Sequence, residues 1–160
     1  MKRTIVIGMA LALLTACTTT GALKPKYVPE AAIQAVPSSE GPPDFYSSAD
    51  WFPDTQGFMQ ERSLAMIPAR VGVILVNKQA LYFVQLNSYE DKYRVLLRIS
   101  LDEIVDVAAD DLGGNRRVVV YTKSRSNTFG VFRNGSGATD EAATEKLLSV
   151  IKQMHKAVAN

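Results

Sequence analysis

The sequence predicts a mainly β domain with some helix (α+β), in which about seven antiparallel strands form a barrel or sandwich closed by one C-terminal helix. Three observations predict this fold. Short apolar runs separated by turn residues recur every ~8–12 residues from residue 64 to residue 133. No segment between consecutive runs is long enough for the helical crossover that a parallel sheet needs. An amphipathic stretch then ends the chain.

The strands are expected where apolar and β-branched residues cluster. Asn77-Lys78-Gln79 leaves a hairpin-sized gap between two of these clusters. The glycine pair within residues 110–115 favours a second turn, because glycine adopts positive φ without steric cost. The expected strands are residues 64–67, 70–76, 80–86, 93–99, 103–107, 117–122 and 128–133.

The C-terminal helix is expected to begin at Thr139, which can cap its first turn. Asp140 and Glu141 follow, and acidic residues are favourable at the positive end of a helix. Apolar residues then recur at spacings of three and four, so we expect the helix to bury one face over an open end of the barrel. This stripe is Leu147, Leu148, Ile151, Met154 and Val158.

The N-terminus reads as an export signal. Lys2-Arg3 precedes an apolar run that is too short to span a bilayer, which takes about 20 residues as a helix. Leu14-Thr15-Ala16-Cys17 resembles the lipobox of bacterial lipoproteins, which implies cleavage after residue 16 and acylation of Cys17, the only cysteine. The alternative is an ordinary secretory signal with an incidental or buried cysteine.

This resemblance implies a lipid-anchored protein of the cell envelope. By the sorting rule of Gram-negative lipoproteins, Thr18 after the cysteine implies the outer membrane, facing the periplasm. In a Gram-positive host the question of sorting to the outer membrane does not arise. The mature chain has no cysteine pair for a disulfide, and without Lys2 and Arg3 its basic and acidic residues balance. Charge therefore gives no argument for nucleic-acid binding.

Residues 17–62 are expected to form a Pro-rich tether, with the domain proper at 63–160. Six of the seven prolines lie in residues 18–62, where they disfavour regular structure. An aromatic cluster near the tether's end has two interpretations. It is either a docking segment for a partner or a strap that packs onto the domain, and we favour the strap. The aromatic residues are Phe45, Tyr46, Trp51, Phe52 and Phe58.

The run GVILVNKQALYF from Gly72 to Phe83, followed by ISLDEIVDV from Ile99 to Val107, resembles the GRAM and bacterial branch of pleckstrin-homology-like (PH-like) domains. The resemblance covers roughly residues 62–158. It implies a scaffold that binds lipids, peptides or proteins and has no catalytic machinery. Phosphoinositide binding in this family needs a dense basic loop in the first hairpin, whereas the loop after Val76 offers only Lys78.

The residues do not assemble a recognisable reaction centre. His155 is the only histidine, and no serine lies in a Gly-x-Ser-x-Gly turn. Residues 135–137 read as a strand-to-helix joint rather than a nucleotide loop, because no βαβ unit surrounds them. The acids Asp106, Asp110 and Asp111 are candidates for a hard cation, although turn acids are usually only solvated. We expect no enzyme, cofactor or metal.

A group of basic residues in the last strands has two interpretations. They either form a binding patch for an anionic lipid headgroup or acidic protein, or they protect an exposed hairpin against edge pairing. We favour protection. The residues are Arg116, Arg117, Lys123, Arg125 and Arg133.

The resulting hypothesis is a membrane-anchored binding or assembly module that docks an envelope protein, for example by strand addition at a sheet edge. The alternative is an enzyme inhibitor with a protruding loop, or a sensor of anionic lipid or a small ligand. A groove between the C-terminal helix and a sheet edge would favour docking. Aromatic or acidic residues on a projecting loop would favour the inhibitor.

Overall fold

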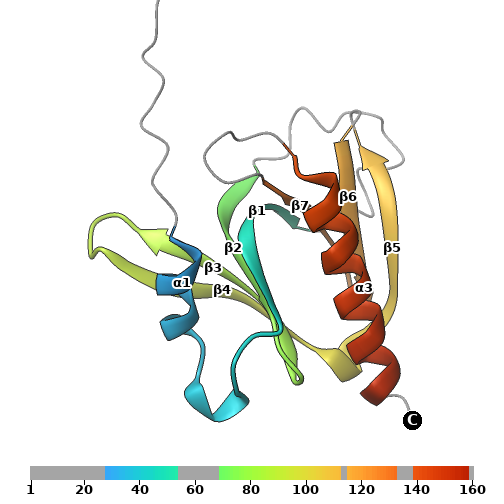
Figure 1. Ribbon diagram of the computed structural model, residues 1–160, viewed down its shortest axis with the longest axis horizontal. Helices are drawn as coiled ribbons and strands as arrows, with labels where there is room; N and C mark the ends of the chain where they lie inside the picture. The colour runs from blue at the N-terminus through green and yellow to red at the C-terminus, as the bar shows by residue number, and fades with distance from the viewer. Residues whose placement is uncertain (1–27, 54–68, 113–114, 133–138, 159–160) are drawn as a thin grey trace, which may run out of the picture.

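The computed structural model describes residues 28–53, 69–112, 115–132 and 139–158 (Figure 1). Seven strands form one sheet in the order β4-β3-β2-β1-β7-β6-β5, and every pairing in it is antiparallel. The predicted fold class is confirmed. The strands are β1 (Phe45–Pro53), β2 (Arg70–Val76), β3 (Ala80–Asn87), β4 (Lys92–Ser100), β5 (Ile104–Leu112), β6 (Asn115–Thr122) and β7 (Ser126–Val131).

The first strand differs from the prediction. The expected strand at residues 64–67 lies outside the described residues, whereas β1 comes from the segment that we expected to be tether. β1 pairs with β2 on one side and with β7 on the other, so it is the central strand of the sheet. Phe45 and Trp51 point into the core from this strand. Residues 45–53 therefore belong to the domain, which begins before the predicted boundary at residue 63.

The turn predicted at residues 110–115 is shorter in the structure, because β5 continues through Leu112. Asp110 lies opposite Arg117 and Asp111 lies opposite Arg116 in the β5–β6 ladder. Oppositely charged residues in directly opposed positions stabilise a strand pair. The ion pair of Asp111 with Arg116, at 3.5 Å, is therefore a contact that favours the strand where the residue types alone favoured a turn.

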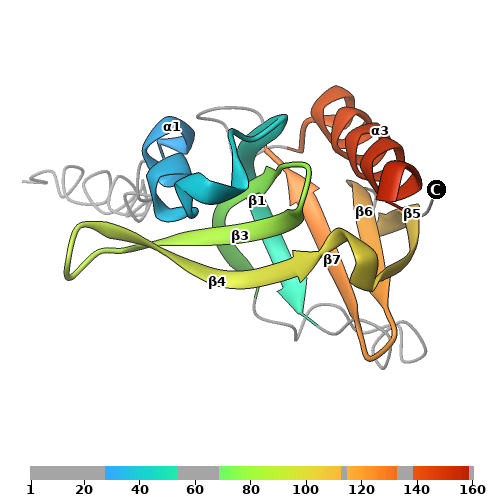
Figure 2. The ribbon, with the colours of Figure 1, turned by 90° about the horizontal axis from the view of Figure 1, so that it is seen from below.

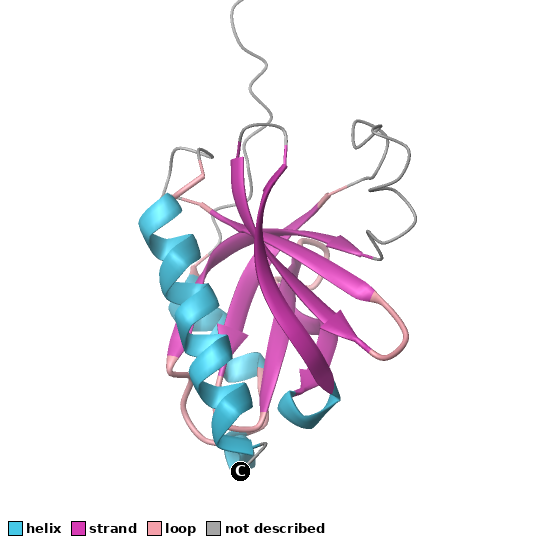
Figure 3. Cartoon of the chain, turned by 90° about the vertical axis from the view of Figure 1, so that its right-hand side faces the viewer, coloured by secondary structure: helices cyan, strands magenta, loops and turns pink. Residues whose placement is uncertain are grey.

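The main core lies between the inner face of the sheet and helix α3 (Glu141–Val158). Figure 3 shows α3 running along one side of the strands. Leu147 and Ile151 are fully buried, and Leu148 and Met154 pack against the same cluster. Val158 is 49% exposed, so the apolar stripe ends one turn earlier than predicted. None of the described helices is long and apolar enough to cross a membrane.

Gly72 in β2 allows a close approach in this core. A Cβ built there would lie 2.4 Å from the carbonyl oxygen of Val84 and 2.8 Å from the ring of Phe83. Only a residue without a side chain leaves room for both groups. The glycine that begins the PH-like motif thus has a packing role.

A second core covers the outer face of the sheet. Three short helices form one segment before β1: α1 (Pro29–Ala32), η1 (Ile33–Ala35) and η2 (Ser38–Glu40). They cover apolar residues of β2, β3 and β4 (Figure 2). Residues 28–44 are thus packed, not extended as tether. Apolar residues between the prolines account for this difference, because they bury against Val73, Leu75 and Tyr82.

Helix α3 is capped one residue later than predicted. The amide of Ala143 donates to Oδ1 of Asp140 at 3.0 Å, while the Thr139 hydroxyl donates to Oδ1 of Asn115. Asp140→Ala is therefore expected to lower the free energy of unfolding by about 1 kcal/mol, as for loss of an N-cap. Urea unfolding monitored by circular dichroism measures this change. Thr139→Ala is the control, and a larger loss in this variant would contradict the assignment.

Candidate functional site

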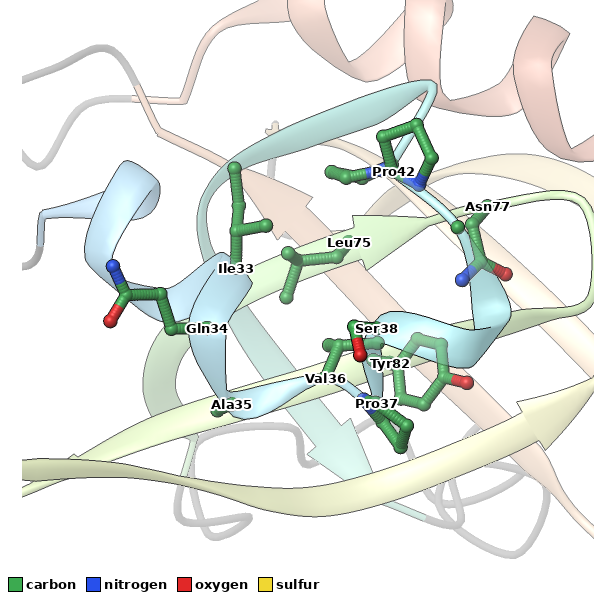
Figure 4. Close-up of a pocket in the computed structure, with 12 residues that line it drawn as sticks. Ile33, Gln34, Ala35, Val36, Pro37, Ser38, Pro42, Leu75, Asn77 and Tyr82 are labelled. Atoms are coloured by element: carbon green, nitrogen blue, oxygen red, sulfur yellow. The ribbon is translucent and has the colours of Figure 1, made fainter.

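A recess of about 580 Å³ opens between the N-terminal helical segment and the outer face of β2 and β3 (Figure 4). In Figure 4, Ile33, Val36, Leu75 and Pro42 lie around it, while Gln34 points away. Leu75 forms its floor from β2. The recess is lined by Ile33, Gln34, Ala35, Val36, Pro37, Ser38, Gly41, Pro42, Pro43, Leu75, Asn77 and Tyr82.

The main polar groups of the recess are already bonded within the protein. The Tyr82 hydroxyl donates to Glu40 and accepts a hydrogen bond from Nε of Arg98 at 3.3 Å. Oδ1 of Asn77 accepts from the amides of Gln79 and Ala80, both at 2.9 Å, and this bonding holds the β2–β3 turn. These groups are occupied in structural bonds, so the recess offers apolar surface and shape. This chemistry suits binding of an apolar group.

Tyr46 lies beside a residue that lines the recess. It lies directly opposite Leu75 in the β1–β2 ladder, so both side chains share the outer face. Its side chain is 40% exposed. Of the five aromatic residues in the predicted cluster, Phe58 lies outside the described residues, and Phe45 and Trp51 are buried in the inner core, where they cannot meet a partner. Phe52 is half-buried beneath Arg117, whose guanidinium lies 4.3 Å from the ring centroid.

Arg117 also forms a buried ion pair. Its Nη1 lies 3.0 Å from Oδ2 of Asp50, and both side chains are largely shielded from solvent. Burial raises the pKa of the Asp50 carboxyl despite the opposing influence of Arg117. The carboxylate also lies against β7, where a Cβ at Gly130 would come within 2.3 Å of Oδ1. Arg117 is thus committed to a contact inside the protein.

The predicted basic patch is not brought together. Arg116 bonds Glu145 at 2.7 Å and Asp111 at 3.5 Å, and these contacts raise the pKa of its guanidinium. Lys123 and Arg125 are exposed at the opposite end of β6, roughly 20 Å along the strand. Arg133 lies outside the described residues. The four described cations therefore do not form one surface for an anionic ligand.

Lys123 and Arg125 instead line a small cleft of about 280 Å³ with Arg98. Asp102 and Glu103, from the short helix η4 (Leu101–Glu103), line the same cleft, so its charge is mixed. A hydrogen bond from the Ser100 side chain lowers the pKa of the Asp102 carboxyl, which keeps this acid ionised beside the cations. The cleft is a weak candidate for an anion site because its own acids compete for the cations.

The other candidates for chemistry are not assembled into a site. Nδ1 of His155 lies 3.2 Å from the carbonyl oxygen of Leu101, where the ring joins α3 to η4. Asp110 and Asp111 are successive residues of a strand, so their side chains point to opposite faces. Within the described ranges, no three acids, histidines or cysteines are grouped as metal ligands are.

Two features of the structure were not predicted from the sequence. The recess was hidden because its residues 33–43 are Pro-rich and were assigned to the tether. The second feature is the hairpin of β3 and β4, which projects from the body (Figures 1 and 2). Tyr89 is fully exposed at its tip, next to Glu90 and Asp91. A lone aromatic residue in an otherwise polar turn was the available signal.

The hairpin around Lys78 joins β2 to β3, and it is the second hairpin of the sheet. The first hairpin joins β1 to β2, and most of its connection lies outside the described residues. Phosphoinositide binding in PH-like domains was expected to need a basic loop in the first hairpin. The loop around Lys78 belongs to the second hairpin, so its few basic residues do not test that requirement. It gives no argument about phosphoinositides.

No family model and no curated protein matches the sequence. Solved structures do match. A Vav1 structure with an allosteric inhibitor has a TM-score of 0.53 and 9% identity, covering 74% of this chain and 28% of the Vav1 chain. The fold is PH-like. The Slm1 PH domain in complex with phosphoserine has a TM-score of 0.48 and 12% identity, covering 71% of this chain and 96% of that domain.

These likenesses concern the fold alone. The chain spans just over a quarter of the Vav1 chain that it matches. The PH-like fold was predicted from the motifs at residues 72–83 and 99–107, and the sheet and helix confirm it. Resemblance to the GRAM branch stays a prediction.

Proposed function

We propose that this chain is a lipoprotein held on a membrane through Cys17, with a PH-like domain that docks a protein partner and has no catalytic role. The expected place is the outer membrane of a Gram-negative envelope, on the periplasmic side. Support for the anchor comes from the lipobox-like Leu14-Thr15-Ala16-Cys17. More than one acyl chain gives stable membrane attachment, because each buried methylene contributes about 0.8 kcal/mol. The domain is then free to bind something other than lipid.

The recess over β2 and β3 carries the docking proposal. Its volume of about 580 Å³ suits one or two apolar side chains of a partner. Tyr46 is an exposed aromatic residue opposite Leu75, which lines the recess, and tyrosine is enriched among the residues that dominate binding energy at interfaces. The Tyr82 hydroxyl and Oδ1 of Asn77 are bonded internally, so an apolar anchor would leave neither of them unpaired. A protein side chain fits these requirements.

Strand addition at a sheet edge has less support. Both edge strands carry an irregularity that leaves one residue without a partner, Leu96 in β4 and Val105 in β5. Such bulges bend an edge and discourage pairing with another strand. We therefore place the docking surface at the recess.

The inhibitor alternative has one observation in its favour, the projecting hairpin with exposed Tyr89 beside two acids. The two functions predict different surfaces. If substitutions in the hairpin abolish binding of a protein and substitutions in the recess do not, the inhibitor is favoured. The anionic-ligand sensor has less support, because Arg116 and Arg117 are engaged within the protein.

The test is to crosslink the intact lipoprotein in living cells, purify it through a C-terminal tag and identify crosslinked proteins by mass spectrometry. Ser38→Trp fills the recess from its rim. We expect it to reduce recovery of a specific partner at least tenfold, since loss of an interface hot spot costs about 2 kcal/mol or more. Ser39→Trp is the matched control, because this neighbouring residue is exposed and does not line the recess.

Equal recovery with both variants would reject the recess as the docking surface. Recovery of lipid alone from the unmodified protein would reject protein docking altogether. The same samples report on the anchor, because the mass of the N-terminal peptide shows whether Cys17 carries acyl chains.

A further inference from the structure

The β3–β4 hairpin lies where the N-terminal segment enters the domain. The amide of Val28 donates to the Tyr93 hydroxyl at 2.8 Å, which joins the start of the described chain to β4. Val28 also lines a groove of about 470 Å³ together with Asp91 and Lys92 of the hairpin. Figures 1 and 2 agree that α1 and the hairpin lie at one end of the molecule, with α3 at the other.

The hairpin tip presents an exposed aromatic ring at this end. Tyr89 is 100% exposed, although a ring of this size is usually at least partly covered. It is four residues from Tyr93, so it lies within about 13 Å of the Val28 contact. Val28 is itself 41% exposed. Apolar surface therefore accumulates near the entry point of the chain.

The charges of the hairpin cancel. Glu90 forms an ion pair with Arg94 across the turn, and Asp91 is followed by Lys92. A segment with no net charge is neither attracted to nor repelled by a zwitterionic surface. The amphipathic ring of tyrosine favours the boundary between lipid headgroups and water.

The distance from Cys17 to Val28 limits where this end of the domain can be. Ten residues separate them. Fully extended, this stretch reaches at most about 40 Å. An anchor at Cys17 would therefore hold Val28 within this reach of the bilayer, so the nearby hairpin would be at a high effective concentration at the lipid surface.

We propose that the tip of the β3–β4 hairpin is a membrane contact, in which Tyr89 inserts its ring among zwitterionic headgroups and orients the domain. This inference rests on the proposed anchoring at Cys17. The contact need not supply affinity, since the acyl chains do that. It fixes which end of the domain faces the lipid, and α3 at the other end faces away from it.

The test uses the full-length chain, purified from bacterial membranes and mixed with phosphatidylcholine vesicles, with and without brominated acyl chains that quench tryptophan. One variant is Tyr89→Trp and the matched control is Val158→Trp, at an exposed position at the far end of α3. The buried native Trp51 gives a common background that the unmodified protein measures. We expect brominated lipid to remove at least half of the added emission at position 89 and to leave position 158 unchanged.

Absence of quenching at position 89, or equal quenching at both positions, overturns the hairpin contact. If one of these two results is obtained with protein that floats with the vesicles and carries acyl chains, the proposed anchor stands and only the hairpin contact fails. If the protein neither floats nor carries acyl chains, both proposals fail.

Discussion

Replacing Phe83 with alanine is expected to lower the free energy of unfolding by about 3–5 kcal/mol, the usual loss for a buried phenylalanine. Phe83 is fully buried at the centre of the inner core. Its ring lies 5.3 Å from the ring of Trp51 and 6.4 Å from that of Phe129. It also fills the space above Gly72, which has no side chain to take its place. Truncation would therefore leave a cavity bordered by three strands that cannot easily collapse.

Urea unfolding followed by the emission of Trp51 measures this loss, because Trp51 is the only tryptophan and contacts the changed residue. Tyr89→Ala is the matched control. It also removes an aromatic ring, but from a fully exposed position, so we expect a change within about 0.5 kcal/mol. Domains of this kind are stable by only about 5–15 kcal/mol in total. A loss at Phe83 no larger than that at Tyr89 would contradict the described core.

Apolar patterning predicted the elements that carry most of the core. Continuous apolar runs predicted the strands at residues 70–76 and 80–86, which bury residues on both faces of the sheet, and helical spacing predicted the apolar stripe of α3. The order of these elements then indicated an antiparallel sheet with a terminal helix. This part of the fold is local in the sequence, so the sequence was sufficient to predict it.

The N-terminal part could not be predicted in this way. β1 contains Ser47, Ser48 and Asp50 between its aromatic residues, so its pattern does not read as a strand. It is stabilised by partners far along the chain, including the hydrogen bond from Nε1 of Trp51 to Oδ1 of Asn127 at 3.0 Å. The recess depends on packing of the same kind. Its location thus follows from long-range contacts that composition does not show.

The basic residues of the last strands also show the difference between closeness in sequence and closeness in the structure. Their clustering in the sequence is real, but a strand about 20 Å long separates Arg116 and Arg117 from Lys123. Arg117 is engaged within the protein because Asp50, far away in the sequence, supplies a buried partner. A count of charges could not reveal that pairing. Tyr46 was a candidate contact from the sequence because it belongs to the aromatic cluster at residues 45–58, and the structure leaves its side chain exposed.

Arg117→Met is expected to destabilise the domain by about 3–5 kcal/mol at neutral pH. The change leaves the buried carboxylate of Asp50 without its cation, and breaking one side of a buried ion pair has this cost. Arg116→Met is the matched control. Arg116 is the preceding residue and also pairs with acids, but its partners are exposed, so unfolding should remain close to that of the unmodified protein. Urea unfolding at pH 7 compares the two variants.

The destabilisation in Arg117→Met should depend on pH in a direction set by Asp50. Burial already raises the pKa of this carboxyl above its ordinary value of 3.8, and Arg117 opposes the rise. Without Arg117 the folded-state pKa rises further. Between 3.8 and that higher pKa the folded chain binds more protons than the unfolded chain, so stability falls as pH rises. The difference in free energy of unfolding between Arg117→Met and the unmodified protein should therefore be smaller at about pH 4 than at pH 7. At the lower pH Asp50 is mostly protonated and needs no cation.

The double variant Asp50→Asn/Arg117→Met, which lacks the carboxylate, should lose this pH dependence. A difference of constant size from pH 4 to pH 7 would mean that Arg117 contributes through its stacking on Phe52 and not through its charge.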